Sequence, residues 1–427
     1  MLYYEESAET GSIDEEALES ILENVIDRIS AEKSIKRVLI LPPDFTRFHS
    51  RAGLITQLLY KLLQDKVKMI LPALGTHYPM SDQQKTLMFE NVPLKIIRDH
   101  NHKTDVIELG RIRCGEMLEI SGGKVDCDWP VQVNRTLIED DWDLIISVGQ
   151  VVPHEVAGMS NYTKNTLVGT GGKECIDKSH YVGASCNMEK IMGQISSPVR
   201  ELLNRGSDRF LNELPIVYIQ TVVAPDETGG TQLKGLFIGD DEECYVKAAT
   251  LAQKTNIFLL DRYPLKIVVH LDADEYKSTW VGNKSIYRTR LALPDGAELI
   301  ILAPGLHCFG ENPDADRLIR KYGYKGTACV ADCIKKDAEL ADNLGSASHL
   351  IHGSSEGRFR ITYCPGKLSR EEIEGVGYNY GNLEEYSAKY DAAALKEGWN
   401  IIDGEEIFYI SNPGLGLWAS RERFELS

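Results

Sequence analysis

The sequence predicts an α/β protein with two α/β domains built on mainly parallel sheets. Short apolar segments typical of strands alternate with longer segments of helical periodicity, and this alternation occurs in two series separated by a pause near residue 261. The length of 427 residues also exceeds what one hydrophobic core usually supports. The alternation favours β-α-β units with right-handed crossovers, and we expect domains at residues 1–260 and 261–427.

The first series begins with an amphipathic helix at residues 13–30, where apolar residues recur every four positions from Ile13 to Ile29. The elements that follow are predicted from their periodicity, namely strands at 36–41, 67–74 and 94–99, and helices at 52–65 and from Ser81. Shorter strands are expected at 106–110, 117–125 and 129–134, and the sheet resumes with an apolar strand from Asp143.

The second series begins at residue 266 with the apolar segment KIVVHLD. It continues with a helix near Lys284, the strand AELIILAPG and a helix near Asp314. The pause before it, FLLDRYPL, lacks either periodicity and therefore marks the expected boundary.

The composition is that of an ordinary globular protein, with 43% apolar and 26% charged residues. A net charge of −17 argues against nucleic acid or an anionic membrane as a partner, and no apolar run approaches the length of a membrane span. The nine cysteines are scattered and form no CxxC pair, and no signal peptide is recognised. We therefore expect a reducing, cytoplasmic location.

Three loops that follow predicted strands carry polar side chains. Because the carboxyl ends of parallel strands meet at one edge of a sheet, these loops are expected to converge on one site. The segment from Gly149 to His180 is the richest, and His154 is expected to be exposed because it follows Pro153 just past a strand end. The candidate residues are Asp44, Thr46 and Arg47 in PPDFTR, His77 in GTHYPMS, and His154, Ser160 and Lys164 in PHEVAGMSNYTK.

Each candidate also has a purely structural interpretation. Arg47 could form a local ion pair with Asp44, and His77 could brace the helix that follows it. Lys164 would ordinarily be a solvated surface lysine, and a single histidine such as His180 is usually structural. Imidazoles and a lysine together nevertheless supply a proton carrier, a metal ligand and a nucleophilic amine.

The combined motifs resemble the nickel-dependent lactate racemase family. The resemblance is carried by DFTR, GTH, DHNHKTDVIELG and PHxxAGxSxxxK, with a histidine sixteen residues after the lysine. It is close over about residues 35–190 and loose over the rest. It implies two α/β domains with the active site in the cleft between them, residues 1–260 binding the cofactor and residues 261–427 closing over the substrate.

The resemblance implies a cofactor made by other, cofactor-synthesis proteins. This is the nickel pincer nucleotide, pyridinium-3,5-bisthiocarboxylic acid mononucleotide nickel, whose two thiocarboxyl arms hold the metal. Lys164 matches the lysine that tethers the cofactor covalently, and His180 matches the histidine that binds nickel. Asp44, Thr46 and Ser160 would contact the cofactor.

The resemblance further implies racemisation or C2-epimerisation of a small-molecule 2-hydroxy acid. His77 and His154 match the two histidines that act as acid and base. One of them takes the hydroxyl proton while hydride leaves C2 for the cofactor, and hydride then returns to the other face of the planar 2-keto acid. Arg47, or Lys284 in WVGNKSIYR, would hold the carboxylate.

The chain departs from the family pattern at three places, one of which is the segment LAPGLHCFGENPDADRLIRKYGYKGT of the second domain. Asn161 and Tyr162 occupy positions that are glycine in the lactate enzymes, and Trp280 and Val281 replace a Tyr-Gln pair near Lys284. These changes favour a substrate larger than lactate, and we expect a sugar acid such as an aldonate. Extra hydroxyls could be bound by His307, Glu311 and Arg288.

Two alternatives use the same residues. The first is a zinc-dependent hydrolase or lyase, which would need neither a nucleotide-derived cofactor nor an adduct on Lys164. The second is a non-catalytic protein that binds the cofactor or a sugar acid, which would cause no exchange at C2.

Overall fold

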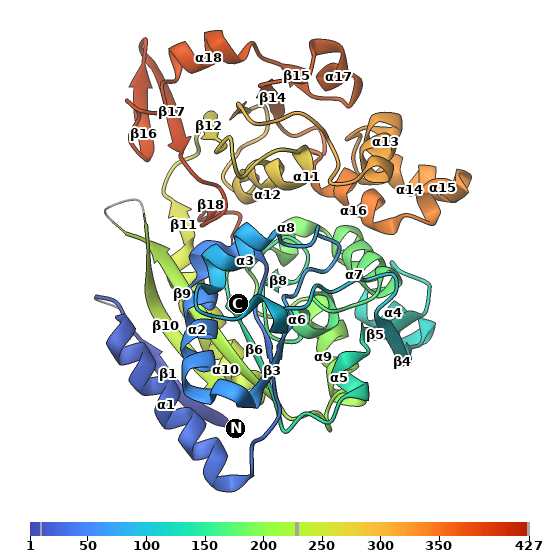
Figure 1. Ribbon diagram of the computed structural model, residues 1–427. Coiled ribbons are helices and arrows are strands. Elements are labelled where there is room, and N and C mark those ends of the chain that lie inside the picture. Colours follow the sequence, from blue (N-terminus) through green and yellow to red (C-terminus); the bar gives the residue numbers. More distant parts are fainter. Residues whose placement is uncertain (9–10, 227–229, 425–427) are drawn as a thin grey trace. The chain divides into compact units, whose positions relative to one another are not determined.

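The computed structural model describes residues 1–8, 11–226 and 230–424. The chain divides into two compact units, each with its own sheet (Figure 1). The first comprises Met1–Ser179 and Met192–Asn256, and the second comprises His180–Ile191 and Ile257–Ser427. A mixed α/β fold with mainly parallel sheets is thus confirmed. The chain passes to the second unit after Asn256, close to the expected boundary, but the second unit also takes in residues 180–191.

The first unit is organised around a six-stranded sheet of order β1-β10-β9-β6-β2-β3. The four strands from β9 to β3 run parallel, whereas β1 and β10 pair antiparallel at the opposite edge. The strands are β1 (Leu2–Ser7), β2 (Val38–Leu41), β3 (Val67–Ile70), β6 (Leu144–Gln150), β9 (Ile216–Pro225) and β10 (Thr231–Gly239).

Helices and two small hairpins complete the first unit. The hairpins pair β4 (Val106–Ile112) with β5 (Trp129–Asn134), and β7 (Pro153–His154) with β8 (Gly158–Met159). The helices are α1 (Glu15–Glu32), η1 (Phe45–Ser50), α2 (Ala52–Leu63), η2 (Gln64–Lys66), α3 (Asp82–Phe89), η3 (Leu94–Ile96), α4 (Cys114–Ile120), α5 (Thr136–Glu139), α6 (Thr163–Leu167), α7 (Lys173–Ser185), α9 (Pro198–Phe210) and α10 (Glu242–Asn256). The helix α7 begins in the first unit and ends in the second.

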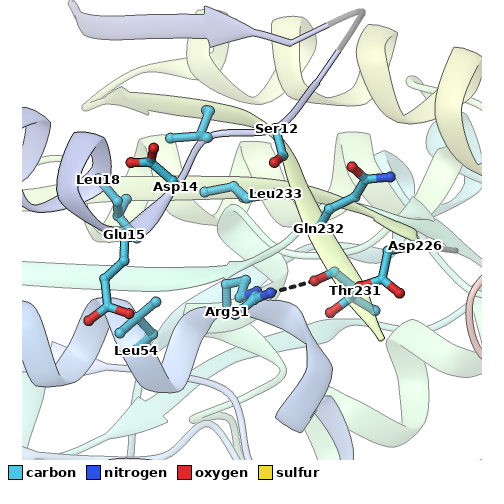
Figure 2. A pocket seen from close by; sticks show the side chains of 11 residues that line it. Ser12, Asp14, Glu15, Leu18, Arg51, Leu54, Asp226, Thr231, Gln232 and Leu233 are labelled. Atoms are coloured by element: carbon cyan, nitrogen blue, oxygen red, sulfur yellow. Dashed lines mark hydrogen bonds between the residues drawn. The ribbon is translucent and has the colours of Figure 1, made fainter. Parts of the chain in front are cut away.

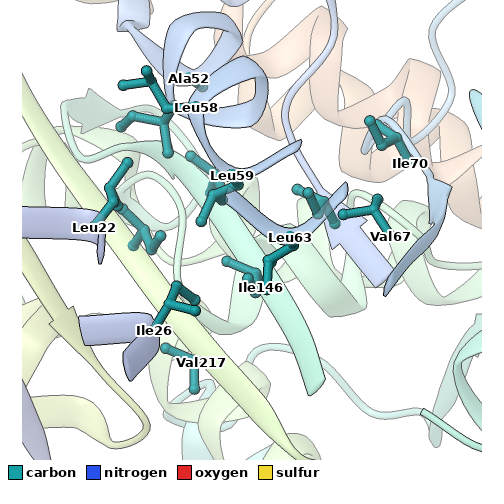
Figure 3. Close-up of a cluster of buried hydrophobic side chains, with 14 of the residues drawn as sticks. Leu22, Ile26, Ala52, Leu58, Leu59, Leu63, Val67, Ile70, Ile146 and Val217 are labelled. Carbon is teal, nitrogen blue, oxygen red and sulfur yellow. The ribbon is translucent and has the colours of Figure 1, made fainter. Parts of the chain in front are cut away.

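The core on one face of this sheet follows directly from the sequence pattern. Leu22 and Ile26 project from α1 toward Leu59 of α2 and Ile146 of β6, as Figure 3 shows. The apolar side chains of α1 recur at intervals of three and four residues, so that one face of the helix is buried. The Asp14 carboxylate accepts a hydrogen bond from the Ala17 backbone N–H and thereby caps the helix.

The second unit has its own six-stranded sheet, of order β15-β14-β13-β12-β17-β16. All neighbouring strands are parallel except β16, which pairs antiparallel with β17. The strands are β12 (Lys266–His270), β13 (Glu298–Ala303), β14 (Arg360–Pro365), β15 (Asn379–Tyr380), β16 (Gly398–Ile402) and β17 (Glu405–Ile410), with a separate parallel pair β11 (Ile257–Leu260) and β18 (Leu417–Ser420).

The second unit also contains helices, one of which begins at Lys284, the residue predicted to hold the substrate carboxylate. They are α8 (Met188–Ile191), α11 (Thr279–Gly282), α12 (Lys284–Thr289), α13 (Pro313–Tyr322), α14 (Thr327–Lys336), α15 (Ala338–Ala341), α16 (Leu344–His352), α17 (Arg370–Gly375) and α18 (Leu383–Lys389). Among the described residues, no helix combines the length and apolar character needed to cross a membrane.

Residues 180–191 are anchored in the second unit by packing and by charge. Ala184 belongs to its hydrophobic core. The Glu189 carboxylate accepts a hydrogen bond from Arg290 Nε at 2.9 Å, and Arg358 Nη2 lies 3.3 Å from the same carboxylate oxygen. Arg290 is nearly fully buried, so these ion pairs are poorly screened by solvent.

Two predicted strands are wrong. Residues 94–99 begin as the short helix η3 after Pro93 and make one bridge to the sheet, between Ile70 and Ile97. Residues 117–125 contain α4, whose buried Met117 and Ile120 lie three apart as on a helix face. This helix is followed by Gly122 and Gly123, both with positive φ.

Candidate active site

The loops after β2 and β3 bring an aspartate and a histidine together. Asp44 precedes η1, and its carboxylate accepts hydrogen bonds from the backbone N–H (3.0 Å) and the hydroxyl of Thr46. Its other oxygen lies 2.6 Å from His77 Nδ1. Burial alone would raise the pKa of Asp44, but the charge of His77 and the hydrogen bonds from His77 and Thr46 outweigh it and lower the pKa.

This pairing determines which nitrogen of the His77 ring carries the proton. An ionised carboxylate can only accept, so Nδ1 carries the proton and the basic nitrogen of the neutral ring is Nε2. The His77 side chain is 46% exposed, which leaves the imidazole accessible to a ligand. The predicted local ion pair between Asp44 and Arg47 is not found in the described chain, since His77 is the ionic partner of Asp44.

Replacing Asp44 with asparagine is expected to destabilise the protein by about 1–2 kcal/mol at pH 7, because the amide can still cap the helix but lacks the charge that strengthens the hydrogen bonds from His77 and Thr46. The folded-state pKa lies below the ordinary value of 3.8. The difference in the free energy of unfolding between variant and wild type should therefore be present above pH 3.8, and it should vanish as the pH falls through the folded-state pKa. Urea unfolding at several pH values measures it, with exposed Asp65→Asn as the control. Equal stability of Asp44→Asn and wild type at pH 7 would contradict this account.

His154 lies in the β7–β8 hairpin, just past the end of β6. The expectation that it is exposed is wrong, because only 7% of the residue is accessible. His154 pairs with Gly158 across the hairpin, and its Nδ1 accepts a hydrogen bond of 3.1 Å from the Val156 backbone N–H. The neutral ring therefore carries its proton on Nε2. Glu155 adds a negative charge 3.7 Å from Nδ1.

Ser160 stabilises the same hairpin. Its hydroxyl donates to the Gln150 carbonyl at 2.6 Å and accepts from the Val152 backbone N–H at 3.1 Å. Ser160, which follows β8 directly, thus ties the end of the hairpin to the end of β6. The contact of this residue with a cofactor, expected from the sequence, stays a prediction.

Lys164 is the second residue of α6 and is partly buried. The pKa of its amine is lowered to about 8, first by the protein packed around it and then by the positive charges of Arg47 and Arg200, against the opposing charges of Glu155 and Asp44. In the part of the chain that the structure describes, no carboxylate forms an ion pair with Lys164. About a tenth of this amine is therefore neutral, and hence nucleophilic, at pH 7.

The backbone just before Lys164 adopts an unusual conformation. Asn161 (φ 64°) and Tyr162 (φ 58°) both have the positive φ that favours glycine. Such conformations cost about 1–3 kcal/mol each for other residues and persist only where surrounding contacts hold them. These are the two positions at which the sequence departs from the glycines of the lactate racemase pattern.

Two predicted residues lie in the second unit. His180 is on α7 within residues 180–191, and it is partly buried. Lys284 begins α12, and its side chain is 15% exposed. Its ammonium lies 4.0 Å from Glu275 Oε1 and 5.5 Å from the centre of the Tyr276 ring.

Polar groups pack beneath this part of α11 and α12. Asn283, which precedes Lys284, accepts hydrogen bonds from the hydroxyls of Tyr363 (2.9 Å) and Tyr378 (3.3 Å). The Trp280 ring stacks on the His349 ring, with 4.3 Å between the ring centres. The start of α12 is therefore held by buried hydrogen bonds and ring packing.

The three residues expected to bind extra hydroxyls differ in exposure. Arg288 is only 1% exposed and lies inside the second unit. Glu311 is partly exposed and accepts a hydrogen bond from the Ser278 hydroxyl, whereas His307 is exposed and bonds the Gly305 carbonyl through Nδ1 at 3.1 Å. Glu311 and His307 are thus the accessible members of the set.

Sequence reasoning missed two charged residues that act on Lys164. Glu155 is next to His154, so its proximity could have been read from the motif. Arg200 lies on α9, far along the chain, and nothing in its local sequence indicates its role. Among the described residues, no group of three or more His, Cys, Asp or Glu side chains is arranged to hold a metal ion.

A cavity of about 320 Å³ in the first unit involves other residues. It lies between the start of α1, the start of α2 and the β9–β10 hairpin, and its lining includes Asp14, Arg51 and Leu54 (Figure 2). Arg51 donates a hydrogen bond to the Thr231 carbonyl across it. None of the predicted site residues lines this cavity.

Comparison with known proteins identifies the region that contains the Asp44–His77 pair and Lys164. Residues 2–192 match the family described as the lactate racemase N-terminal domain. This region of the chain is similar to that family. The matched region includes the three polar loops and ends just after α8.

Solved structures extend the likeness in fold to the whole chain. A crystal structure of a protein from Thermotoga maritima has 23% identity and a TM-score of 0.83, covering 96% of this chain and 99% of its own. The lactate racemase apoprotein from Thermoanaerobacterium thermosaccharolyticum has 15% identity and a TM-score of 0.67, covering 95% of this chain and 93% of its own. No curated protein matches the chain.

Proposed function

We propose that the protein is an isomerase that racemises or epimerises a 2-hydroxy acid at C2 with a nickel pincer nucleotide. The observation that carries the proposal is the setting of Lys164. The partly buried amine lies in the region that matches the lactate racemase N-terminal domain, and its pKa is near 8. The charges of Arg47 and Asp44 both act on this amine, and Asp44 is bonded to His77. A nucleophilic amine beside a carboxylate–imidazole pair suits both cofactor attachment and proton transfer.

The residues present fit the proposed cofactor. Lys164 offers a nucleophilic amine for the covalent tether, and Arg47 places positive charge near it, which suits an anionic group. His180 would supply one imidazole ligand, which is compatible with nickel held by soft sulfur donors. When bound, the nickel pincer nucleotide supplies the acceptor for the hydride that leaves C2.

The two histidines would divide the proton transfers. His77 offers Nε2 as a base for the substrate hydroxyl, and Asp44 stabilises the imidazolium that forms. His154 carries its proton on Nε2, so it would donate a hydrogen bond to the substrate oxygen. The guanidinium of Arg47 or the ammonium of Lys284 would hold the carboxylate through charge-assisted hydrogen bonds.

The substrate would be larger than lactate, with an aldonate as the first candidate. Glu311 and His307 of the second unit support this assignment, because both are accessible and could bind additional hydroxyls. A site that hydrogen-bonds a substrate hydroxyl discriminates strongly against substrates that lack it, because its buried polar groups would then have no partner.

The proposal is tested with protein co-expressed with cofactor-synthesis proteins. Lactate and a series of aldonates are incubated with it, and inversion at C2 is followed by chiral chromatography. We expect inversion of at least one aldonate at more than ten times the rate for lactate. Lactate turnover as fast as that of any aldonate would refute the substrate assignment, and no inversion of any 2-hydroxy acid would refute the function.

A further inference from the structure

The turn before Lys164 is held by contacts to β9 and α10. Asn161 Nδ2 donates to Gln220 Oε1 at 2.7 Å. The Tyr162 ring lies 4.5 Å from that of Tyr218 and stacks on that of Tyr245 at 5.4 Å. Both positive-φ residues are thus fixed by their side chains, which glycines could not provide.

Arg200 of α9 joins the two ends of this turn. One guanidinium nitrogen, Nη2, donates to the Met159 carbonyl at 2.7 Å, and the other, Nη1, donates to the Thr163 hydroxyl at 3.0 Å. These acceptors lie on either side of Asn161 and Tyr162. A planar guanidinium can satisfy both at once, which an ammonium group cannot do in the same way.

The Arg200 charge is buried and has an aromatic rather than an ionic neighbour. The residue is 2% exposed, and its guanidinium carbon lies 4.2 Å from the centre of the Tyr245 ring. Within the described ranges, no carboxylate forms an ion pair with it. A buried cation without a counter-ion acts strongly on other charges nearby, because little solvent screens it.

We propose that Arg200 is a positioning residue for Lys164, holding the turn that orients the lysine and disfavouring a second positive charge beside it. The proposal rests on the proposed function only for the identity of the group that Lys164 attacks. The charged groups acting on this amine are Arg47 of η1 and Arg200 of α9, opposed by Glu155 of the hairpin and Asp44 before η1. Burial of the amine acts in the same direction as the two arginines.

The consequence is a reactive amine before any cofactor is present. With a pKa of about 8, roughly a tenth of the amine is neutral at pH 7. An ordinary lysine with a pKa of 10.5 has a neutral fraction about 300-fold smaller at that pH. Arg200 accounts for part of this difference, since burial and Arg47 contribute as well.

The test uses the full chain without cofactor, so its outcome does not depend on turnover. Lysines are acetylated with a limiting amount of acetic anhydride between pH 6 and 10, and each site is quantified by peptide mass spectrometry relative to exposed Lys124. Lys164 should label with a midpoint near pH 8. Arg200→Met, which keeps an unbranched side chain beside Tyr245, should lower Lys164 labelling at pH 7 by about threefold to tenfold.

Controls separate charge from geometry. Arg205→Met removes an arginine of the same helix that pairs with Glu201, and it should leave the Lys164 midpoint unchanged. Thr163→Val removes one acceptor of Arg200 and keeps its charge, so amide exchange of residues 161–164 should quicken while the midpoint stays near that of wild type. Thr163→Val also provides a test if Arg200→Met does not fold.

Two results would overturn the proposal. One is a folded Arg200→Met protein whose Lys164 labels with the wild-type midpoint. The other is a Thr163→Val protein with unchanged exchange at residues 161–164. Failure of the proposed function has a different signature, namely normal labelling of Lys164 in the free protein with no adduct after co-expression with cofactor-synthesis proteins.

Discussion

Replacing Lys164 with alanine is expected to abolish covalent attachment of the cofactor. The amine is the proposed nucleophile, and its lowered pKa keeps a reactive fraction neutral near pH 8. Intact-mass spectrometry of protein co-expressed with cofactor-synthesis proteins should give an adduct on wild type and the bare chain mass for Lys164→Ala. Racemase activity should fall with the adduct.

Lys124→Ala serves as the matched control, because Lys124 is exposed in a loop of the same unit and should leave the adduct intact. An adduct of unchanged mass and amount on Lys164→Ala would show that the cofactor is tethered elsewhere. Lys164→Arg distinguishes charge from nucleophilicity, since it retains the positive charge but should also lack the adduct.

Replacing His77 or His154 with asparagine should lower C2 inversion by about 10²- to 10⁴-fold while nickel and adduct remain bound. His77 would lose the basic Nε2 oriented by Asp44, and His154 would lose its Nε2 proton donor. Chiral chromatography measures the rate, and elemental analysis with intact mass measures the cofactor.

His180→Ala should give the opposite pattern, in which nickel is lost and the adduct on Lys164 is retained. The three variants together separate proton transfer from metal binding. Wild-type turnover in either His77→Asn or His154→Asn would contradict the assigned roles, and full nickel occupancy in His180→Ala would remove it as the ligand.

Much of the first unit could be predicted because local patterns determine it. The apolar spacing of α1 and the strand ends before Asp44 and His77 follow from periodicity and from the geometry of parallel sheets. The strands predicted at residues 94–99 and 117–125 are wrong because short apolar runs do not distinguish a strand from a helical turn. In α4, the burial of Met117 and Ile120 on one face favours the helix.

The parts that could not be predicted depend on contacts distant in sequence. Residues 180–191 join the second unit through Glu189, whose partners Arg290 and Arg358 lie more than a hundred residues away. The burial of His154 depends on how the β7–β8 hairpin folds back after Pro153. The link between Arg200 and the turn before Lys164 likewise requires the packing of α9.

The central claim is that C2 is inverted by hydride transfer, and an isotopic label tests it directly. A 2-hydroxy acid deuterated at C2 is incubated in ordinary water with the cofactor-loaded protein, and the inverted product is examined by mass spectrometry. Transfer of hydride to and from an acceptor within the site predicts that deuterium stays at C2 in the product. Replacement of the label by protium from solvent during inversion would establish proton abstraction instead and contradict the account.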